Sequence, residues 1–382
     1  MPPFGAYPAG REICMFSEEA YMANLFDYLA WRGDLPFDAV GFNEIDGMIL
    51  ARFAYADFEH AAPMQNGEAS LGEVAWALAE KQTEKTDDLA LLRTLAESER
   101  FRSLRLSDYE NRFDAETQTQ FSAITVRLTE GVSYLAFRGT DTTLVGWKEN
   151  FNMAFLCPVP SQREAADYLA RAAKKKGRLI LGGHSKGGNL AVYAAALCKP
   201  SVQQRIDAVY NYDGPGFEAS VLHSEGYRQI LPRVHTFVPQ SSIIGMLLEH
   251  GEKITVVHST RTNGLQQHDL CSWEVLPRGF LCMEERTSSS RFIDATVSAW
   301  LAEIDYAQRK CVIDTVYGAL EQTHAQTLQE LSERRFAATK AVLRAARHFD
   351  EETKNAVTQT LRLLMRSVQK ELPTLRRKNT PQ

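Results

Sequence analysis

The first hundred residues carry apolar positions at helical spacing. Residues 17–31 place apolar side chains three and four positions apart behind a Ser-Glu-Glu run, which predicts a capped amphipathic helix. Residues 71–100 show leucines at similar spacing among many charges and predict one or two surface helices. Residues 39–58 mix glycine and asparagine with apolar residues, so their pattern favours neither helix nor strand.

The period of the pattern changes after residue 120. Residues 121–128 alternate between apolar and polar, a Thr-Glu-Gly turn follows, and residues 132–137 continue as a second strand of a hairpin. Beyond the hairpin, helices at 165–176 and 190–197 are interspersed with short apolar strands at 179–181, 208–212, 234–238 and 254–257. Strands that alternate with helices predict an α/β fold with a mostly parallel sheet and helices on both faces.

The strand signal stops near residue 292. Apolar residues four positions apart among charges, such as Val312, Val316 and Leu320, predict two or three helices there. We therefore divide the chain into an α/β domain with an N-terminal helical segment, residues 1–290, and a helical C-terminal extension, residues 291–382. Packing of this extension on the first domain is favoured over pairing with another chain.

Composition narrows the classes of protein. Of the 382 residues, 44% are hydrophobic and 24% charged, which is typical of a globular protein with a sizeable core. The formal net charge of -5 argues against nucleic-acid binding. No stretch reaches the roughly 20 apolar residues that span a bilayer, so a lipid would be met by a soluble or peripherally bound enzyme. The cysteines lack zinc spacing and several have apolar neighbours, and no signal peptide is evident, which favours a cytoplasmic protein without a metal site.

The most informative segment reads Arg-Leu-Ile-Leu-Gly-Gly-His-Ser-Lys-Gly-Gly-Asn-Leu-Ala, residues 178–191. An apolar strand runs into a Gly-rich turn and an Ala-rich helix, with Ser185 at the turn. Gly183 and Gly187 flank the serine at the spacing of a nucleophile elbow, where neighbouring backbone leaves no room for a Cβ. The segment predicts that Ser185 is a nucleophile. The alternative is a Gly-rich turn whose serine merely caps the helix.

Two segments carry a resemblance to a known family. The run Gly-His-Ser-Lys-Gly-Gly-Asn-Leu-Ala from Gly183 resembles the elbow of the class 3 (fungal-type) lipases of the α/β-hydrolase superfamily. Residues 134–141, Tyr-Leu-Ala-Phe-Arg-Gly-Thr-Asp, resemble the strand and loop that supply half of the lipase oxyanion hole, and residues 146–150 resemble the segment after it. The resemblance covers roughly residues 120–275 and implies an α/β-hydrolase fold in the first domain. The whole chain also resembles an uncharacterised bacterial group of lipase-related proteins.

A serine hydrolase of this class needs a histidine base after the serine. His268 lies in a polar loop just after the last predicted strand, where the family places its histidine, and we predict it as the base. His250 and His258 are the alternatives.

The acid of the triad is less clear in the sequence. The lipases carry it after the strand that corresponds to residues 234–238, where this chain has Pro-Gln-Ser-Ser. Asp213 follows the preceding strand, at the same sheet edge as the serine, and we predict it as the acid, with turn capping as the alternative. Asp269 is expected to point away from its neighbour His268. Without a carboxylate, Gln240 or Ser241 would orient the imidazole.

The resemblance also implies the remaining site residues. Thr140 would donate its backbone N–H to the oxyanion, with its hydroxyl as a further candidate donor, and Lys186 would donate its backbone N–H. Lys186 departs from the neutral residue usual in the lipases; its side chain would hold an anionic head group, pair with a carboxylate or cap the adjacent surface. The apolar segment 142–159, with Trp147 and Phe151, corresponds to a lid or wall of the acyl pocket, although a core helix explains it nearly as well.

These features predict a carboxylic ester hydrolase that acts on a small-molecule ester or lipid through an acyl-enzyme, without metal or organic cofactor. Two other functions use the same features. One is a catalytically degenerate binding protein with the hydrolase fold. The other is an acyltransferase or thioesterase with the same triad.

Overall fold

The computed structural model describes residues 23–82, 86–114, 116–117, 119–140, 152–153, 157–262, 264, 266–288 and 290–291. Trp147 and Phe151 of the predicted acyl pocket lie outside these residues. So does the predicted helical extension from residue 292 onward, and so does the expected start of the first helix at residues 17–22.

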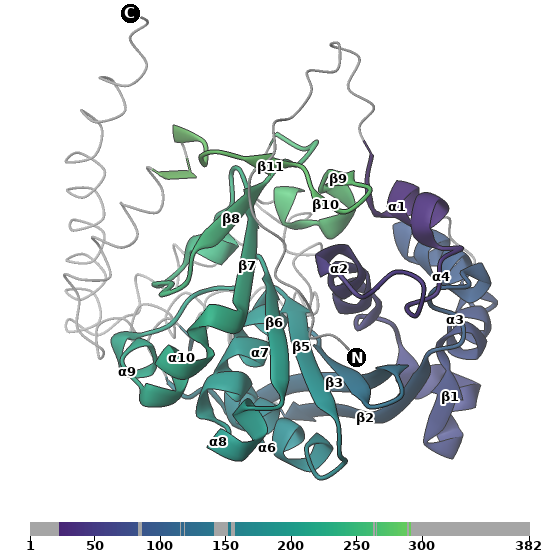
Figure 1. Ribbon diagram of the computed structural model, residues 1–382, viewed down its shortest axis with the longest axis horizontal. Helices are drawn as coiled ribbons and strands as arrows, with labels where there is room; N and C mark the ends of the chain where they lie inside the picture. Colours follow the sequence, from purple (N-terminus) through teal and green to yellow (C-terminus); the bar gives the residue numbers. More distant parts are fainter. Residues whose placement is uncertain are drawn as a thin grey trace, which may run out of the picture.

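An N-terminal layer of helices covers one side of the sheet (Figure 1). It consists of α1 (Leu25–Arg32), α2 (Glu44–Phe53), α3 (Leu71–Ala79) and α4 (Asp87–Glu97), with short 3-10 turns at Phe58–His60 and Ala62–Asn66. The prediction of one or two helices within residues 71–100 is confirmed, with α3 and α4 as two separate helices. Helix α1 begins at Leu25, where the Asn24 side chain accepts the Phe26 N–H and caps its first turn.

A nine-stranded mixed sheet forms the centre of the α/β fold. Its order is β1-β2-β3-β4-β5-β6-β7-β8-β11. The strands from β4 to β8 are parallel, and the flanking pairs are antiparallel. The sheet is therefore less uniformly parallel than predicted. Its strands are β1 (Glu68–Ser70), β2 (Arg105–Asp114), β3 (Thr119–Thr129), β4 (Val132–Phe137), β5 (Arg178–His184), β6 (Ile206–Tyr212), β7 (Val234–Pro239), β8 (Ile254–Val257) and β11 (Cys282–Met283).

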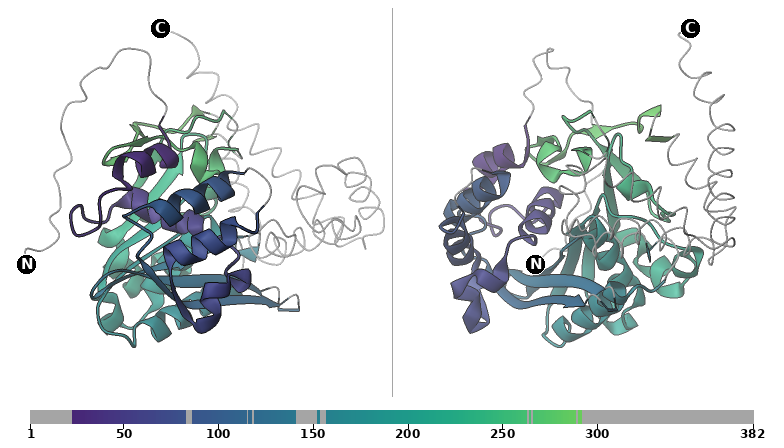
Figure 2. Two further views of the ribbon diagram at one scale, coloured as in Figure 1. Left: turned by 90° about the vertical axis from the view of Figure 1, so that its right-hand side faces the viewer. Right: turned by 180° about the vertical axis from the view of Figure 1, so that it is seen from behind.

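A second group of helices covers the other side of the sheet, as the view from behind shows (Figure 2). Of these, α6 packs on β3, and α7 packs on β4, β5 and β6. The group comprises α6 (Pro160–Ala172), α7 (Lys186–Leu197), α8 (Pro200–Gln203), α9 (Ala219–Leu222) and α10 (Glu225–Ile230). In the described part of the chain, no helix is long and apolar enough to cross a membrane.

Alternation along β4 divides the interior into two cores. Tyr134 and Ala136 belong to the cluster on the side of the N-terminal layer, whereas Leu135 and Phe137 belong to the cluster beneath α6 and α7. Successive side chains of a strand point to opposite faces, so a strand that is apolar at every position is covered on both faces.

Helix α2 lies unusually close to the sheet. The hydroxyls of Tyr134 and Tyr212 donate to the backbone carbonyls of Gly47 (3.0 Å) and Glu44 (2.6 Å) of this helix. A Cβ on Gly47 would lie 2.4 Å from the Tyr212 hydroxyl, so a glycine permits this approach.

A fully buried ion pair fixes the segment before α2. Arg100 donates to both carboxylate oxygens of Asp46, at 2.7 and 2.6 Å. Its other N–H groups donate to the carbonyls of Leu35, Val40 and Gly41. The guanidinium thus supplies hydrogen-bond donors to backbone carbonyls in a segment that has no regular secondary structure.

A small hairpin closes the N-terminal layer against the end of the described chain. The hairpin pairs β9 (Val275–Leu276) with β10 (Gly279–Phe280). Val275 N–H donates to the carbonyl of Ala23 (2.9 Å), and the Arg32 side chain donates to that of Pro277 (3.1 Å). The layer is therefore joined to residues about 250 positions away in sequence, so the contact closes almost the whole length of the domain.

Candidate active site

Ser185 sits at the sharp turn between β5 and α7. Its backbone has φ 58° and ψ -131°, a left-handed conformation that is rare outside glycine. The turn is held because Ser185 N–H donates to the Tyr212 carbonyl on β6, and the Ser185 carbonyl accepts from Gly188 N–H, both at 2.9 Å. Strain of this kind persists where the surrounding structure enforces it, as at many functional sites.

The glycines that flank Ser185 allow the turn. A Cβ on Gly183 would lie 2.4 Å from the carbonyl carbon of Gly187. A Cβ on Gly187 would lie 2.1 Å from the Phe137 carbonyl oxygen at the end of β4. Larger residues would push β4, β5 and α7 apart, which agrees with the tight turn expected from the sequence.

Asp213 and His268 form a hydrogen-bonded pair. Asp213 follows β6 with φ 52°, and its side chain is fully buried. Its Oδ2 lies 2.6 Å from His268 Nδ1, in the 3-10 turn η5 (Gln266–His268). The other carboxylate oxygen accepts a hydrogen bond from Ser242 Oγ. An acceptor at Nδ1 fixes the donor role of that nitrogen, which leaves Nε2 of neutral His268 as an acceptor.

This pair lies at the same sheet edge as Ser185. Asp213 directly follows Tyr212, whose carbonyl accepts the Ser185 N–H. A Cβ on Gly214 would lie 2.3 Å from the Ser185 carbonyl oxygen. The structure thus gathers the three predicted triad residues at the carboxyl ends of β5 and β6, where open α/β sheets bind ligands.

Two amide side chains brace the loop that carries Asp213. Asn189 Nδ2, from the first turns of α7, donates to the carbonyls of Pro215 (3.1 Å) and Gly216 (2.9 Å). Gln162 Nε2, from α6, donates to Asn189 Oδ1 (2.8 Å). The sequence pattern did not indicate these residues, since a buried amide network has no local signature.

The alternative orienting groups are engaged elsewhere. Both amide atoms of Gln240 bond the backbone of Ser259, and Ser241 Oγ lies 3.0 Å from Thr287 Oγ1. Asp269 accepts the Cys271 N–H (3.1 Å), so it points away from its neighbour as expected. None of these side chains faces the His268 imidazole through a hydrogen bond in the described part of the structure.

The alternative histidines are likewise paired elsewhere. His250 is buried, with Nδ1 3.0 Å from Glu252 Oε1 and Nε2 2.7 Å from the Gly245 carbonyl oxygen. His258 pairs with the carboxylate of Glu274.

The segment after β4, which is predicted to supply part of the oxyanion hole and is called the oxyanion segment, lies against the Ser185 turn. A Cβ on Gly139 would lie 2.5 Å from the His184 carbonyl oxygen and 3.2 Å from Ser185 Cβ. The next residue, Thr140, has a buried hydroxyl without a hydrogen-bond partner among the residues that the structure describes. Buried hydroxyls are normally paired, so a hydroxyl that has no partner among the described residues, one position after Gly139, is consistent with a role toward a substrate.

Lys186 is almost fully buried, with 1% of its surface exposed. Its ammonium group donates to the Gln120 carbonyl on β3 at 2.6 Å. Of the roles considered for this side chain, capping of the adjacent surface is therefore wrong. This hydrogen bond ties the start of α7 to β3.

His184 is a component of the site that the sequence did not single out. Its Nε2 lies 2.8 Å from the backbone carbonyl of His268, and its Nδ1 lies 3.1 Å from the Tyr55 hydroxyl. Burial, and then the nearby His268, hold the pKa of His184 well below its ordinary value, so its ring is neutral. The carbonyl partner requires Nε2 to carry the proton, and Nδ1 then accepts from Tyr55.

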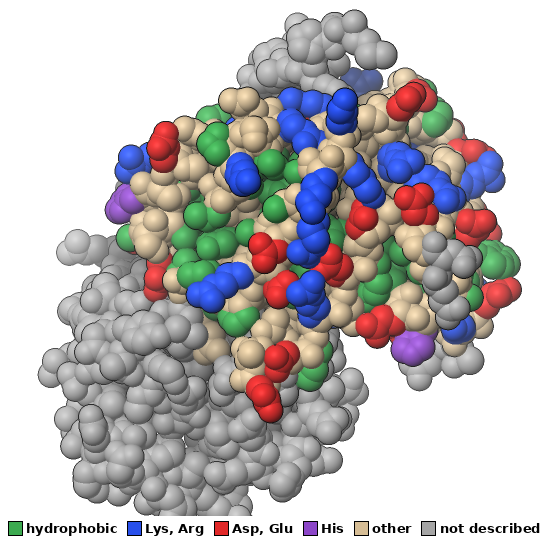
Figure 3. Space-filling model, turned by 90° about the horizontal axis from the view of Figure 1, so that it is seen from below, with side chains coloured by type: hydrophobic (Ala, Val, Ile, Leu, Met, Phe, Trp, Pro, Cys, Tyr) green, Lys and Arg blue, Asp and Glu red, His purple; other side chains and the backbone are tan. Residues whose placement is uncertain are grey.

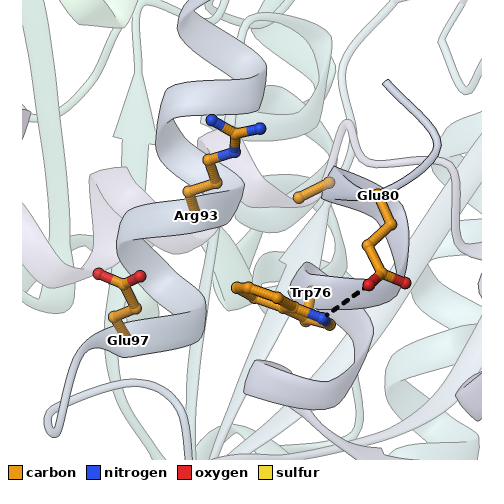
Figure 4. A pocket seen from close by; sticks show the side chains of 5 residues that line it. Trp76, Glu80, Arg93 and Glu97 are labelled. Atoms are coloured by element: carbon orange, nitrogen blue, oxygen red, sulfur yellow. Dashed lines mark hydrogen bonds between the residues drawn. The ribbon is translucent and has the colours of Figure 1, made fainter. Parts of the chain in front are cut away.

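A separate pocket lies away from these residues. It has a volume of about 280 Å³, between α3 and α4, and is lined by Trp76, Ala79, Glu80, Arg93 and Glu97 (Figure 4). The Trp76 indole N–H donates to Glu80 of its own helix at 3.1 Å. The pocket therefore shares no lining residue with the Ser185 site.

Comparison with known proteins gives one family. The Mbeg1-like family model matches residues 95–318, more than half of the 382 residues, and no curated protein matches the chain. The chain belongs to the Mbeg1-like family. This match is consistent with a lipase-like superfamily and does not single out the class 3 lipases. It includes Ser185, Asp213 and His268, whereas Tyr55 lies before it.

Proposed function

We propose that this protein is a serine acyl hydrolase that cleaves a carboxylic ester. Ser185 is the nucleophile, His268 the general base and Asp213 the acid that orients it. The hydrogen bond between His268 Nδ1 and Asp213 Oδ2, 2.6 Å long and at the same sheet edge as the strained Ser185 turn, carries this proposal. A parallel five-strand core with the nucleophile after β5, the acid after β6 and the base after β8 also supports an α/β-hydrolase framework.

The reaction follows from the protonation of the pair. Asp213 holds the proton on His268 Nδ1, so Nε2 accepts the Ser185 proton as Oγ attacks the ester carbonyl. The buried carboxylate stabilises the imidazolium that forms. His268 then protonates the leaving alcohol, and a water activated in the same way releases the acid from the acyl-enzyme.

The oxyanion would be held by Thr140 and Lys186. Lys186 is the first residue of α7, where backbone N–H groups lack partners within the helix and favour negative charge. Among the described residues, the Thr140 hydroxyl is buried and has no hydrogen-bond partner, which supports it as the second donor to the oxyanion. Trp147 and Phe151 remain our candidates for acyl contact.

A fluorophosphonate probe tests the nucleophile directly, since it reacts with an activated serine whatever the natural substrate. We expect the folded wild type to be labelled and Ser185→Ala to be unlabelled. The same substitution should lower kcat/KM on a short p-nitrophenyl ester by more than about 10³-fold.

Ser224→Ala is the matched control, because Ser224 caps α10 away from the site and its loss leaves the triad intact. It should label at the wild-type rate. A correctly folded wild type that takes up no probe would contradict the proposal and favour a binding protein that has lost catalysis.

A further inference from the structure

A chain of hydrogen bonds links the N-terminal layer to the base. The Tyr55 hydroxyl donates to His184 Nδ1 (3.1 Å), and His184 Nε2 donates to the His268 carbonyl (2.8 Å). The centroids of the His184 and His268 rings also lie 4.4 Å apart, and the ring planes are tilted by 38°. The chain thus connects three segments that are far apart in sequence.

We propose that Tyr55 and His184 are positioning residues for His268, which fix its backbone and thereby aim its imidazole between Asp213 and Ser185. This inference rests on the proposed function. It adds to the site two groups that act through His268.

Among the described residues, the other hydrogen bond of His268 itself is the one from its ring to Asp213. Asp213 holds Nδ1, but a single hydrogen bond leaves the ring free to swing about that contact. The bond from His184 fixes the peptide of the same residue, so the imidazole is held at two points. The second point belongs to the residue next to the nucleophile, which couples the positions of base and serine directly. Displacements of about 1 Å in such groups can lower rates about 100-fold.

The adjoining residue holds the outer side of the same loop. The Gln267 side chain accepts from Ser241 N–H (2.8 Å) and donates to the Arg261 carbonyl (2.6 Å). These bonds attach the loop to neighbouring loops. The His184 bond attaches the same loop to the nucleophile turn. The Gln267 bonds therefore hold the loop in the fold, whereas the His184 bond sets its position relative to Ser185.

The arrangement requires a neutral His184. An imidazolium with its centroid 4.4 Å from that of the His268 ring would oppose the positive charge that His268 acquires during catalysis. Among the described residues, the titratable and charged groups that face His184 are His268 from the base loop, Arg52 from α2 and Tyr55 from the turn after α2. The Tyr55 hydroxyl occupies Nδ1 as a donor and therefore disfavours a proton at that nitrogen.

Tyr55 also fits tightly against the oxyanion segment. A Cβ on Gly139 would lie 2.1 Å from the Tyr55 hydroxyl oxygen. The hydroxyl therefore stands where the oxyanion segment, the nucleophile turn and the base loop meet. Tyr55 lies before the region that the family model matches, residues 95–318. Through this contact, the N-terminal layer would form part of the catalytic unit.

The test compares rates of fluorophosphonate labelling in the full-length chain, from pH 5 to 9. The variants are His184→Ala, His184→Gln and Tyr55→Phe. Glutamine carries an amide N–H about as far from the backbone as Nε2, so it can still donate to the His268 carbonyl. Tyr134→Phe is the matched control. It also removes a tyrosine hydroxyl that donates a buried hydrogen bond, but the acceptor is the Gly47 carbonyl of α2 and not a residue of the proposed chain.

We expect His184→Ala to label about 10- to 100-fold more slowly than the wild type. Tyr55→Phe should lose about three- to tenfold, the effect of one weakened hydrogen bond. His184→Gln should recover to within about threefold of the wild type, and Tyr134→Phe should stay within about twofold, although its melting temperature falls.

Equal labelling rates for Tyr55→Phe and Tyr134→Phe would overturn the positioning role, even if His184→Ala fails to fold. So would a His184→Gln variant no faster than His184→Ala. If the wild type itself is unlabelled, the proposed function fails and the positioning role fails with it. If the wild type is labelled and the variants are labelled at the same rate, the positioning role is wrong and the proposed function stands.

Discussion

Ser185 and Asp213 share an unusual backbone feature, a positive φ angle. Both follow parallel strands, and both adopt positive φ angles, 58° and 52°, although neither is glycine. The left-handed conformation turns each residue sharply off its strand, so the side chain stands above the sheet edge. Neighbouring glycines at Gly183 and Gly214 leave space for these turns. The cost in local strain is of order 1–3 kcal/mol per residue.

The Thr140 hydroxyl provides a test at the scale of one atom. If this buried group donates to the oxyanion, Thr140→Val should lower the rate of fluorophosphonate labelling about 100-fold. Valine keeps the shape and removes the donor. Thr140→Ser keeps the donor and should label at nearly the wild-type rate, as measured by gel fluorescence over time. Unchanged labelling of the valine variant would exclude the hydroxyl and leave the backbone N–H as the donor.

The sequence could predict the site residues whose signal is local. Glycines around Ser185 indicate the turn, and the positions of Asp213 and His268 after predicted strands indicate a shared edge. His184 and Tyr55 could not be predicted as partners, because they lie 129 positions apart and meet through tertiary packing. The catalytic roles themselves remain predictions that the labelling experiments address.

Helix α2 shows why a local pattern can be indecisive. Gly47 lowers its helix propensity, and the sequence favoured no element at residues 39–58. Tertiary contacts decide the matter: Tyr134 and Tyr212 donate to helix carbonyls, and Asn43 caps the first turn. Strand β2 (Arg105–Asp114) was missed for a related reason, since its outer half is charged and exposed.

Gly47→Ala tests this close packing. The added methyl would meet the Tyr212 hydroxyl at 2.4 Å and force the helix away from the sheet. Overpacking of this kind costs about 1–3 kcal/mol, which corresponds to a melting temperature lower by about 2–10 °C. In the control Gly41→Ala, the new methyl meets no atom within 4 Å, so its melting temperature should be equal or higher. Thermal unfolding followed by circular dichroism compares the two, and a Gly47→Ala protein as stable as wild type would contradict the packing argument.

At the scale of the whole molecule, stability rests on the interior. Figure 3 shows Lys and Arg side chains interleaved with Asp and Glu over one face. Surface ion pairs, such as Arg171 with Glu110 and Lys175 with Asp108, contribute little because water and salt screen them. The two apolar cores on either side of the sheet and the buried polar networks therefore carry most of the stability.

Glu252 belongs to one such network and predicts a pH dependence. Burial alone would raise the pKa of this carboxyl; His250, and then Thr236 and Tyr227, outweigh burial and lower the pKa to about 2. A folded-state pKa below the unfolded value stabilises the protein above about pH 4.5, and this contribution is lost as the pH falls from 4.5 toward 2.

Glu252→Gln should therefore lower the melting temperature at pH 7 by about 5–10 °C. The difference from wild type should shrink as the pH is lowered from 5 to 3, because the wild-type carboxylate loses its advantage. Differential scanning fluorimetry at several pH values measures both effects. Glu225→Gln, at an exposed carboxylate bonded to Gln229, should show no such trend. A difference that stays constant with pH would contradict the role of the Glu252 charge.

The contact between Ala23 and Val275 bears on the order in which the protein folds during synthesis. Strands β2, β3 and β4 are neighbours in sequence and can pair as soon as they emerge, since local contacts form quickly. The N-terminal layer precedes these strands, yet its partners on β6, the base loop and the β9–β10 hairpin lie well after them in the sequence. We therefore expect the earliest part of the chain to be among the last to dock, so that the nucleophile, acid and base come together only once the hairpin has been made.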